Sequence, residues 1–168
     1  MSLSLHAASV PVLIHSLTAL AAILTKAEAH ATAQRIDPNA LLQARLYPDM
    51  LPLVRQVQIT CDMAKAGASR LAQMEVPSHP DTETTFPELQ ARVQKVIDLL
   101  KGIPASAIDG GEDRIVTIKV AGNEMSFTGA DYLVRWVNPN FFFHLTTSYA
   151  LLRHNGLPIG KRDYLGSA

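Results

Sequence analysis

The segment from Asn138 to Gly156 constrains the fold more than any other part of the chain, because it carries signals for both ends of one helix. Asn138 is a favourable N-cap, and Pro139 falls at the first helical position, where a missing N–H costs nothing. Gly156 can adopt the left-handed conformation that ends a helix, and Pro158 prevents continuation. We therefore predict one helix here, against which the rest of the chain packs.

The predicted helix has one apolar face with a polar flank. The residues of the face recur at helical spacing and are Phe141, Leu145, Tyr149 and Leu152. Asn140 and His144 lie one turn apart on the flank, about 40° apart around the helix axis. A polar pair at the edge of a buried face is a candidate site, but the sequence does not name its ligand.

Two helices are predicted in the first half of the chain from their apolar periodicity. The first covers residues 9–33, with Ser9 as its cap, and a short turn of helix follows at residues 37–43. The second long helix covers residues 48–74 and carries an apolar seam that faces partner helices. The seam residues are Met50, Leu53, Val57, Cys61, Ala64, Ala68 and Leu71.

A third long helix begins at a capping box, in which Thr85 and Glu88 each bond the other's backbone N–H, and it ends at Gly102. Residues 114–127 are then β-branched and alternating around a turn, which predicts a small hairpin against the outside of the helices. The predicted fold is all-α: a four-helix bundle with a small β-hairpin before the last helix, as a single domain over residues 1–168.

Charge and cysteine content exclude some classes of function. The chain has 15 Lys and Arg residues and 15 Asp and Glu residues, so it lacks the basic excess of a nucleic-acid surface. Its one cysteine, Cys61, allows no internal disulfide and fits a reducing compartment, so we expect a cytoplasmic protein. Zero net charge with 48% hydrophobic residues favours self-association, and we expect a homodimer.

The apolar stretch from Val10 to Leu24 raises the alternative of a signal peptide or a membrane span. No positive charge precedes it, and His15, Ser16 and Thr18 interrupt it. Its apolar residues follow a helical period, so we interpret it as a core helix and expect no contact with a membrane.

Several short motifs carry a family resemblance that covers nearly the whole chain. They are Arg45-Leu46-Tyr47-Pro48-Asp49-Met50, Gln56-Val57-Gln58, Pro139-Asn140-Phe141-Phe142-Phe143-His144, Leu152-Arg153-His154-Asn155-Gly156 and Gly160-Lys161-Arg162-Asp163-Tyr164-Leu165-Gly166. They resemble a bacterial domain-of-unknown-function family grouped with the DinB/YfiT-like metalloenzyme superfamily. The resemblance implies a four-helix bundle and a dimer, without an established activity.

The resemblance also implies a metal site of three histidines, which this chain only partly retains. In members that bind metal, one histidine comes from the second helix and two come from a His-x-x-x-His on the last helix. His144 stands at the second position of that pair, but Asn140 replaces the first, and residues 48–74 contain no histidine. Amide oxygens are poor ligands for Zn²⁺ or Ni²⁺. A divalent metal held by His144 and Asn140 is thus the alternative, and no cofactor is the main expectation.

The candidate pocket residues are polar or aromatic groups that the helices bring near His144. They are Asp49, Gln56, Asn140, His144 and Tyr149. Each also has a structural interpretation: Asn140 could bond the first helical turn, and Asp49 could pair with Arg45. We predict that His144 points inward, toward a polar group of the second helix or of the Asn140 turn, and holds no tightly bound Zn²⁺.

Three hypotheses of function remain open at this point. The first is a helical-bundle protein of unknown activity with a degenerate metal-type pocket. The second is an enzyme that resembles weakly metal-dependent thiol transferases or isomerases of the DinB/YfiT type. The third is a dimeric scaffold, or a protein that binds a small molecule.

Overall fold

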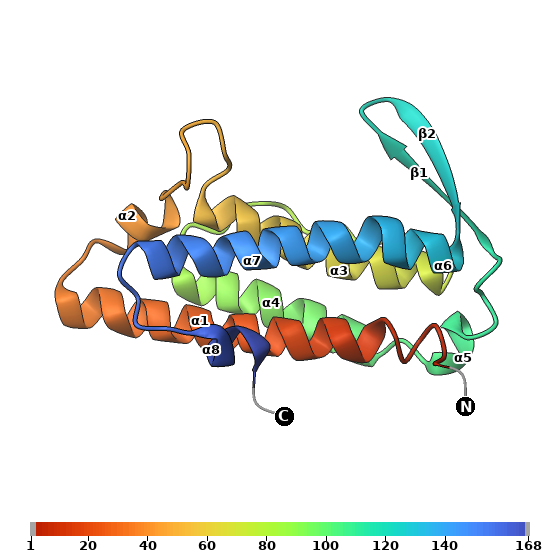
Figure 1. The fold of residues 1–168 in the computed structure, drawn as a ribbon, viewed down its shortest axis with the longest axis horizontal. Coiled ribbons are helices and arrows are strands. Elements are labelled where there is room, and N and C mark those ends of the chain that lie inside the picture. Colours follow the sequence, from red (N-terminus) through yellow and green to blue (C-terminus); the bar gives the residue numbers. More distant parts are fainter. Residues whose placement is uncertain (1–2, 167–168) are drawn as a thin grey trace.

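The computed structural model describes residues 3–166 and shows a helix-dominated fold with one small antiparallel hairpin (Figure 1). The predicted class of fold is thereby confirmed. In chain order the elements are α1 (Val10–Gln34), α2 (Pro38–Leu42), α3 (Leu53–Leu71), α4 (Phe86–Lys101), α5 (Ala105–Ile108), β1 (Ile115–Val120), β2 (Asn123–Thr128), α6 (Gly129–Asp131), the π-helix η1 (Tyr132–Val137), α7 (Asn138–His154) and α8 (Lys161–Leu165).

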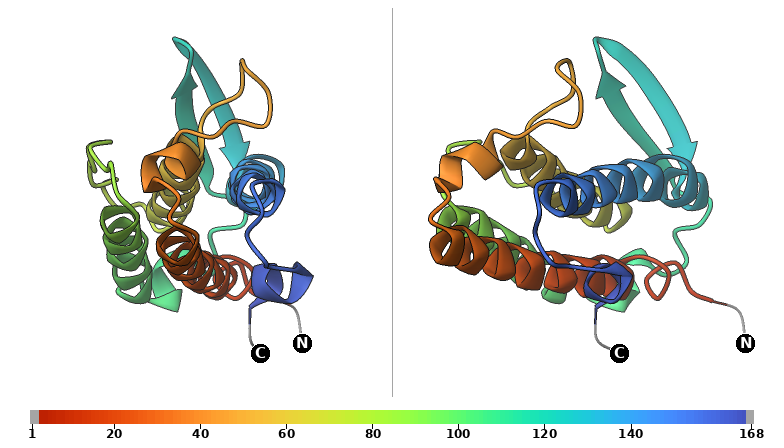
Figure 2. Two further views of the ribbon diagram at one scale, coloured as in Figure 1. Left: turned by 90° about the vertical axis from the view of Figure 1, so that its left-hand side faces the viewer. Right: turned by 60° about the vertical axis from the view of Figure 1, so that its left-hand side comes forward.

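The long helices lie in two layers, with α3 beside α7 and α1 beside α4 (Figures 1 and 2). Contacts between α3 and α4 join the layers, and α8 lies against α1. Each long helix has an apolar stripe that must be covered, and this arrangement turns the stripes toward one another.

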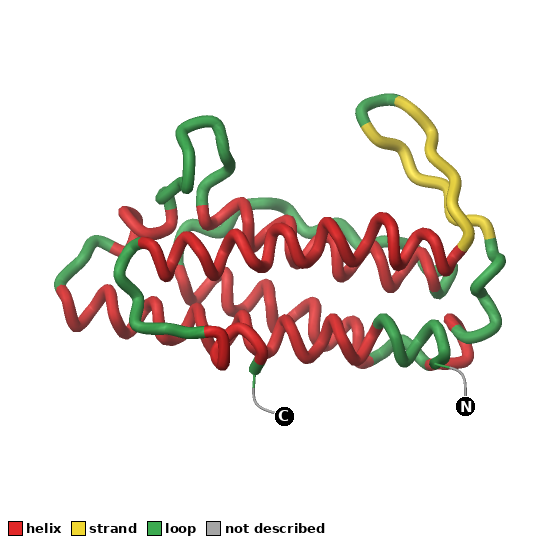
Figure 3. Tube along the Cα trace, in the orientation of Figure 1, coloured by secondary structure: helices red, strands yellow, loops and turns green. Residues whose placement is uncertain are grey.

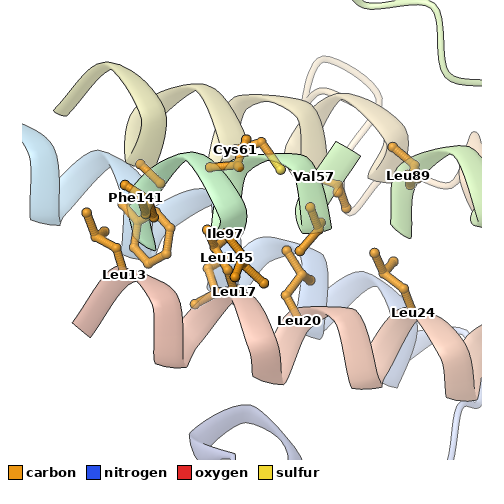
Figure 4. Close-up of a cluster of buried hydrophobic side chains, with 14 of the residues drawn as sticks. Leu13, Leu17, Leu20, Leu24, Val57, Cys61, Leu89, Ile97, Phe141 and Leu145 are labelled. Carbon is orange, nitrogen blue, oxygen red and sulfur yellow. The ribbon is translucent and has the colours of Figure 1, made fainter. Parts of the chain in front are cut away.

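The core fills the space between the layers, and most of its residues follow the predicted helical faces. Figure 4 labels part of it: Leu13, Leu17, Leu20, Leu24, Val57, Cys61, Leu89, Ile97, Phe141 and Leu145, all buried. Burying each large side chain contributes about 1.5–3 kcal/mol to stability, so these stripes hold the helices together.

Helix α1 is a core helix, as predicted. Within residues 3–166 it is the one helix long and apolar enough to cross a membrane, but half of its most apolar stretch is buried inside the fold. Val10, Leu17 and Ala27, spread along its length, are all buried. Such burial is typical of the core helix of a soluble protein.

The predicted caps of α2 and α4 are confirmed. Asp37 Oδ1 accepts a hydrogen bond from Asn39 N at 2.9 Å, which fixes the first turn of α2. Thr85 Oγ1 accepts from Glu88 N at 3.3 Å, and Glu88 Oε2 accepts from Thr85 N at 3.0 Å. Both ends of the capping box therefore satisfy backbone donors that the helix itself leaves free.

Helix α3 begins at Leu53, five residues later than predicted, because the preceding residues form a closed loop. Leu53 N donates to Ala44 O at 3.0 Å, and the Arg45 guanidinium donates to Met50 O. Pro52 is extended, and a proline disfavours helix in the residue before it. The predicted start of this helix and the Arg45–Asp49 pair are therefore wrong.

The end of α3 also comes earlier than predicted, at Leu71. Gln73 has a φ of 55°, and Met74 N donates back to Ser69 O at 2.8 Å. A left-handed residue closed by such a bond ends a helix.

Helix α7 begins at Asn138, but α6, η1 and α7 form one continuous helical run, so no free helix end lies there. Pro139 therefore lies inside that run, where its ring would clash with the carbonyl one α-helical turn earlier. The wider turns of η1 directly precede Pro139 and make room for it. Asn138 is not a cap, and its buried Oδ1 has no hydrogen-bond partner among the described residues.

The hairpin rises from the same side of the molecule as the loop of residues 43–52 (Figure 3). Its strands pair from Ile115 with Thr128 to Val120 with Asn123. Only the base lies against the helices: the Phe127 ring is 6.0 Å from that of Trp136 on η1. The predicted hairpin is confirmed, and its tip projects away from the helices (Figure 1).

Candidate functional site

Gln56 lies in the first turns of α3 and is almost completely buried, with 2% of its surface exposed. Its amide nitrogen donates to Leu51 O at 3.1 Å, which ties it to the loop before the helix. Its amide oxygen lies 2.7 Å from His144 Nδ1 on α7. Both polar ends of the side chain are therefore satisfied, as a buried amide requires.

The Gln56 oxygen determines which nitrogen of His144 carries the proton. An amide oxygen can only accept, so Nδ1 is the N–H donor, and in the neutral ring Nε2 keeps its lone pair. Burial lowers the pKa of His144 below its ordinary value of 6.5, which favours the neutral ring. The Phe143 ring stands edge-on to the imidazole, with centroids 5.1 Å apart.

The predicted orientation of His144 is confirmed: it is partly buried and bonded to a polar group of the second long helix. The neighbouring amide is used differently. Asn140 Nδ2 donates to Trp136 O at 2.7 Å, one turn back along its own helix. Asn140 thus satisfies a backbone carbonyl beside the proline, in line with its structural interpretation.

The other two candidate residues have no hydrogen bond to the Gln56–His144 pair in the described part of the chain. Asp49 is exposed in the loop of residues 43–52. Tyr149 is half-buried and packs edge-on against Tyr164 of α8, with ring centroids 5.7 Å apart. Within residues 3–166, the site therefore consists of Gln56 and His144, flanked by Phe143.

This donor set does not fit a tightly bound Zn²⁺ or Ni²⁺. One imidazole is present, and its Nε2 could supply a single ligand, because the Nδ1–H bond to Gln56 leaves that nitrogen free. Asn140 is hydrogen-bonded to Trp136 O of its own helical run. Among the described residues, no three His, Cys, Asp or Glu side chains gather closely enough to hold an ion. Structural and catalytic zinc sites use three or four such ligands.

A second polar cluster lies on another face of α3, and the sequence analysis missed it. The Arg92 guanidinium, with 2% of its side chain exposed, bonds Asp62 at 3.0 Å, Asp81 at 2.9 Å and Glu83 at 3.1 Å. Lys65 also bonds Asp62, at 2.9 Å. The capping box marks the start of α4 in the sequence, but no local pattern marks a buried arginine one turn later.

The fold is that of a helical protein of the DinB-like class. The crystal structure of a DinB family member protein from Shewanella denitrificans matches the chain with a TM-score of 0.88 and 38% sequence identity. The match covers 98% of this chain and 93% of that one.

Within that class, the chain belongs to the family described as Domain of unknown function (DUF1993), whose model matches residues 5–165. The family resemblance drawn from the short motifs is thereby confirmed. In a comparison with curated proteins, none matches the chain.

Proposed function

We propose that this DinB-like protein binds a small molecule at the Gln56–His144 pair, without a tightly held transition metal. The observation that carries the proposal is the 2.7 Å contact between Gln56 Oε1 and His144 Nδ1. A hydrogen bond at one ring nitrogen fixes the tautomer and leaves the other nitrogen to a ligand. We interpret the pair as a degenerate form of the metal-type pocket, in which one histidine remains and a glutamine bonds it.

The chemistry of the pair favours a ligand with one acidic hydrogen. A neutral imidazole accepts a hydrogen bond at Nε2, or takes a proton from an O–H or S–H group. Gln56 holds the ring in place because its amide is buried and bonded at both ends. Phe143, with 57% of its surface exposed, offers an apolar surface beside it.

A second candidate function is weakly metal-dependent thiol chemistry of the DinB/YfiT transferase or isomerase type. It is favoured by the position of His144 in the family motif and by its Nε2 lone pair, which could serve as one ligand. In this alternative, added Zn²⁺ would be required before a thiol binds.

An NMR titration of the His144 ring, in protein purified without a histidine tag, tests the proposal. The probes are phenol and 2-mercaptoethanol, each with and without added Zn²⁺. We expect saturable shifts of His144 without metal, both in the unmodified protein and in the matched His154→Phe. In His144→Phe, which lacks the reporter ring, binding is followed by broadening of the probe's own signals, and we expect that broadening to be lost. Shifts that require Zn²⁺ would favour the second candidate, and no shift with either probe would contradict the proposal.

We also propose that α1, α3, α4 and α7 form a DinB/YfiT-type four-helix bundle and that the protein is a cytoplasmic homodimer. Tyr47 and Phe143 support the dimer, because 65% and 57% of their surfaces are exposed, and exposed aromatic residues are enriched at interfaces. Sedimentation velocity at micromolar concentration should give a dimer that Phe143→Asp weakens. A monomer of the unmodified protein would contradict the dimer.

A further inference from the structure

Residues 76–84 form an irregular strap between α3 and α4 that is held down by charged groups. The buried Arg92 bonds Asp81, Glu83 and the carbonyl of Pro80. Gln58 Nε2 donates to Glu83 Oε2 at 2.9 Å from α3. The strap is therefore clamped from both helices that it connects.

Two cavities lie along the strap, and His79 lines both. One has a volume of about 350 Å³ and is also lined by Glu83, Arg92 and Lys95. The other has a volume of about 310 Å³ and is also lined by Lys65. Each space is large enough for a small organic acid or a phosphate.

Some of the charged groups around His79 have partners within the protein, and others do not. Glu83 and Asp62 are bonded to Arg92, and Glu88 is bonded to the backbone N–H of Thr84. Lys95 is exposed and has no ion pair among the described residues. On the wall of the larger cavity, within the described residues, Lys95 therefore has no carboxylate partner, and the Glu88 carboxylate has no cationic one.

Two polar atoms at the strap are buried and have no hydrogen-bond partner within residues 3–166: Nδ1 of His79 and Nε of Arg92. Leaving such an atom without a partner costs about 1–3 kcal/mol, so it calls for an explanation. The Arg92 side chain is 98% buried, and it lines the larger cavity. Both atoms could be satisfied by a group with several acceptor oxygens.

We propose that the strap of residues 76–84 covers a second ligand site, which takes a small oxyanion, a carboxylate or a phosphate, between His79, Arg92 and Lys95. The oxyanion bonds His79 and Lys95 directly and reaches Arg92 Nε when the strap shifts. Pro77 and Pro80 leave the strap without a backbone ladder, so the side-chain bonds from Arg92 and Gln58 are what hold it in place.

This site is separate from the Gln56–His144 pair. Gln56 and Gln58 lie about 200° apart around α3, so one faces α7 and the other faces the strap. The test of one site is therefore independent of the test of the other.

His79 is the natural reporter for an oxyanion. Burial is the largest cause of its lowered pKa, and Lys65, Lys95 and Arg92 lower it further, whereas Asp62 opposes them. A bound anion opposes these cations, so it raises the pKa of His79.

The experiment is an NMR titration of the His79 ring with sodium acetate and with sodium phosphate, at constant ionic strength set with sodium chloride. The variant Lys95→Gln removes the uncommitted cation. The matched control is Lys119→Gln on the hairpin, whose side chain is exposed and lines neither cavity. Both substitutions remove one surface charge and leave the Arg92 clamp intact.

We expect a saturable shift of His79 with acetate or phosphate that raises its pKa, and the anion that binds more tightly identifies the preferred oxyanion. Lys95→Gln should weaken binding about fivefold, and Lys119→Gln should not change it. Three results would each overturn the proposal: no saturable shift, an equal response to chloride, or identical binding by both variants. Water would then be the group that satisfies His79 Nδ1 and Arg92 Nε.

Discussion

Gln56 and His144 are 88 positions apart in the chain, yet the Gln56 amide oxygen and the His144 Nδ1 lie 2.7 Å apart. The contact links α3 to α7, the two helices of one layer (Figure 1). Gln56 also bonds Leu51 O, so the same amide joins the histidine to the loop of residues 43–52. Gln56 thus sets the orientation of the His144 ring from the neighbouring helix, and the loop holds Gln56 in place.

Replacing Gln56 with alanine should destabilise the protein by about 1–3 kcal/mol, because it leaves His144 Nδ1 and Leu51 O without their partner. The free energy of unfolding in urea measures this effect. The control is Gln94→Ala, an exposed glutamine on α4, which should change stability by less than about 0.5 kcal/mol. Equal stability of both variants would show that the Gln56 bonds contribute nothing.

The lowered pKa of His144 predicts a loss of stability in acid. The unfolded chain takes up a proton near pH 6.5 and the folded chain only at lower pH, so stability is full above 6.5 and falls as the pH drops toward the folded pKa. His144→Gln should therefore lose less stability than the unmodified protein between about pH 7 and pH 5. His154→Gln, an exposed change on the same helix, should behave like the unmodified protein, and an equal pH response of all three would contradict the shift.

Gly67 lets η1 approach α3 closely, since a Cβ at this position would lie 2.6 Å from Val137 Cγ1. Gly67→Ala gains about 1 kcal/mol of helix propensity but should lose about 1–3 kcal/mol to overpacking. In a double-mutant cycle, Val137→Ala should relieve the overpacking, so the double variant is more stable than the sum of the two single changes predicts. Additive effects would show that α3 and η1 simply move apart.

Cys61 should be unreactive in the folded protein. It lies in the core (Figure 4), and burial raises the pKa of its thiol to about 12, so almost no thiolate is present at neutral pH. A colorimetric thiol reagent should label it only after unfolding in guanidinium chloride. Fast labelling of the native protein would mean that the core opens around α3.

The sequence predicted those parts of the fold that local signals determine. The Thr85–Glu88 capping box, the Asp37 cap and the left-handed Gly156, with a φ of 91°, are short-range features and were found. The start of α3 was missed because Met50 continues the apolar period of the helix, although it lies in the loop closed by Leu53 N and Ala44 O. A loop that is closed by a bond between residues nine positions apart does not show in the periodicity of apolar residues.

The candidate site shows the same division. His144 was found because an aromatic stretch precedes it in a helix whose C-terminal end is recognisable, and Gln56 was among its candidate partners. The sequence could not distinguish Gln56 from Asp49, because the outcome depends on where α3 begins. The Arg92 cluster was missed because its carboxylates come from α3 and from the strap, and only the fold brings them together.

The most direct test of the account is a ¹H–¹⁵N correlation spectrum of the His144 ring, in protein purified without a histidine tag, before and after treatment with a metal chelator. We predict a proton on Nδ1, a free Nε2, a pKa below 6.5 and a spectrum that the chelator leaves unchanged. A proton on Nε2, or His144 signals that move as the chelator removes a stoichiometric metal, would contradict the account.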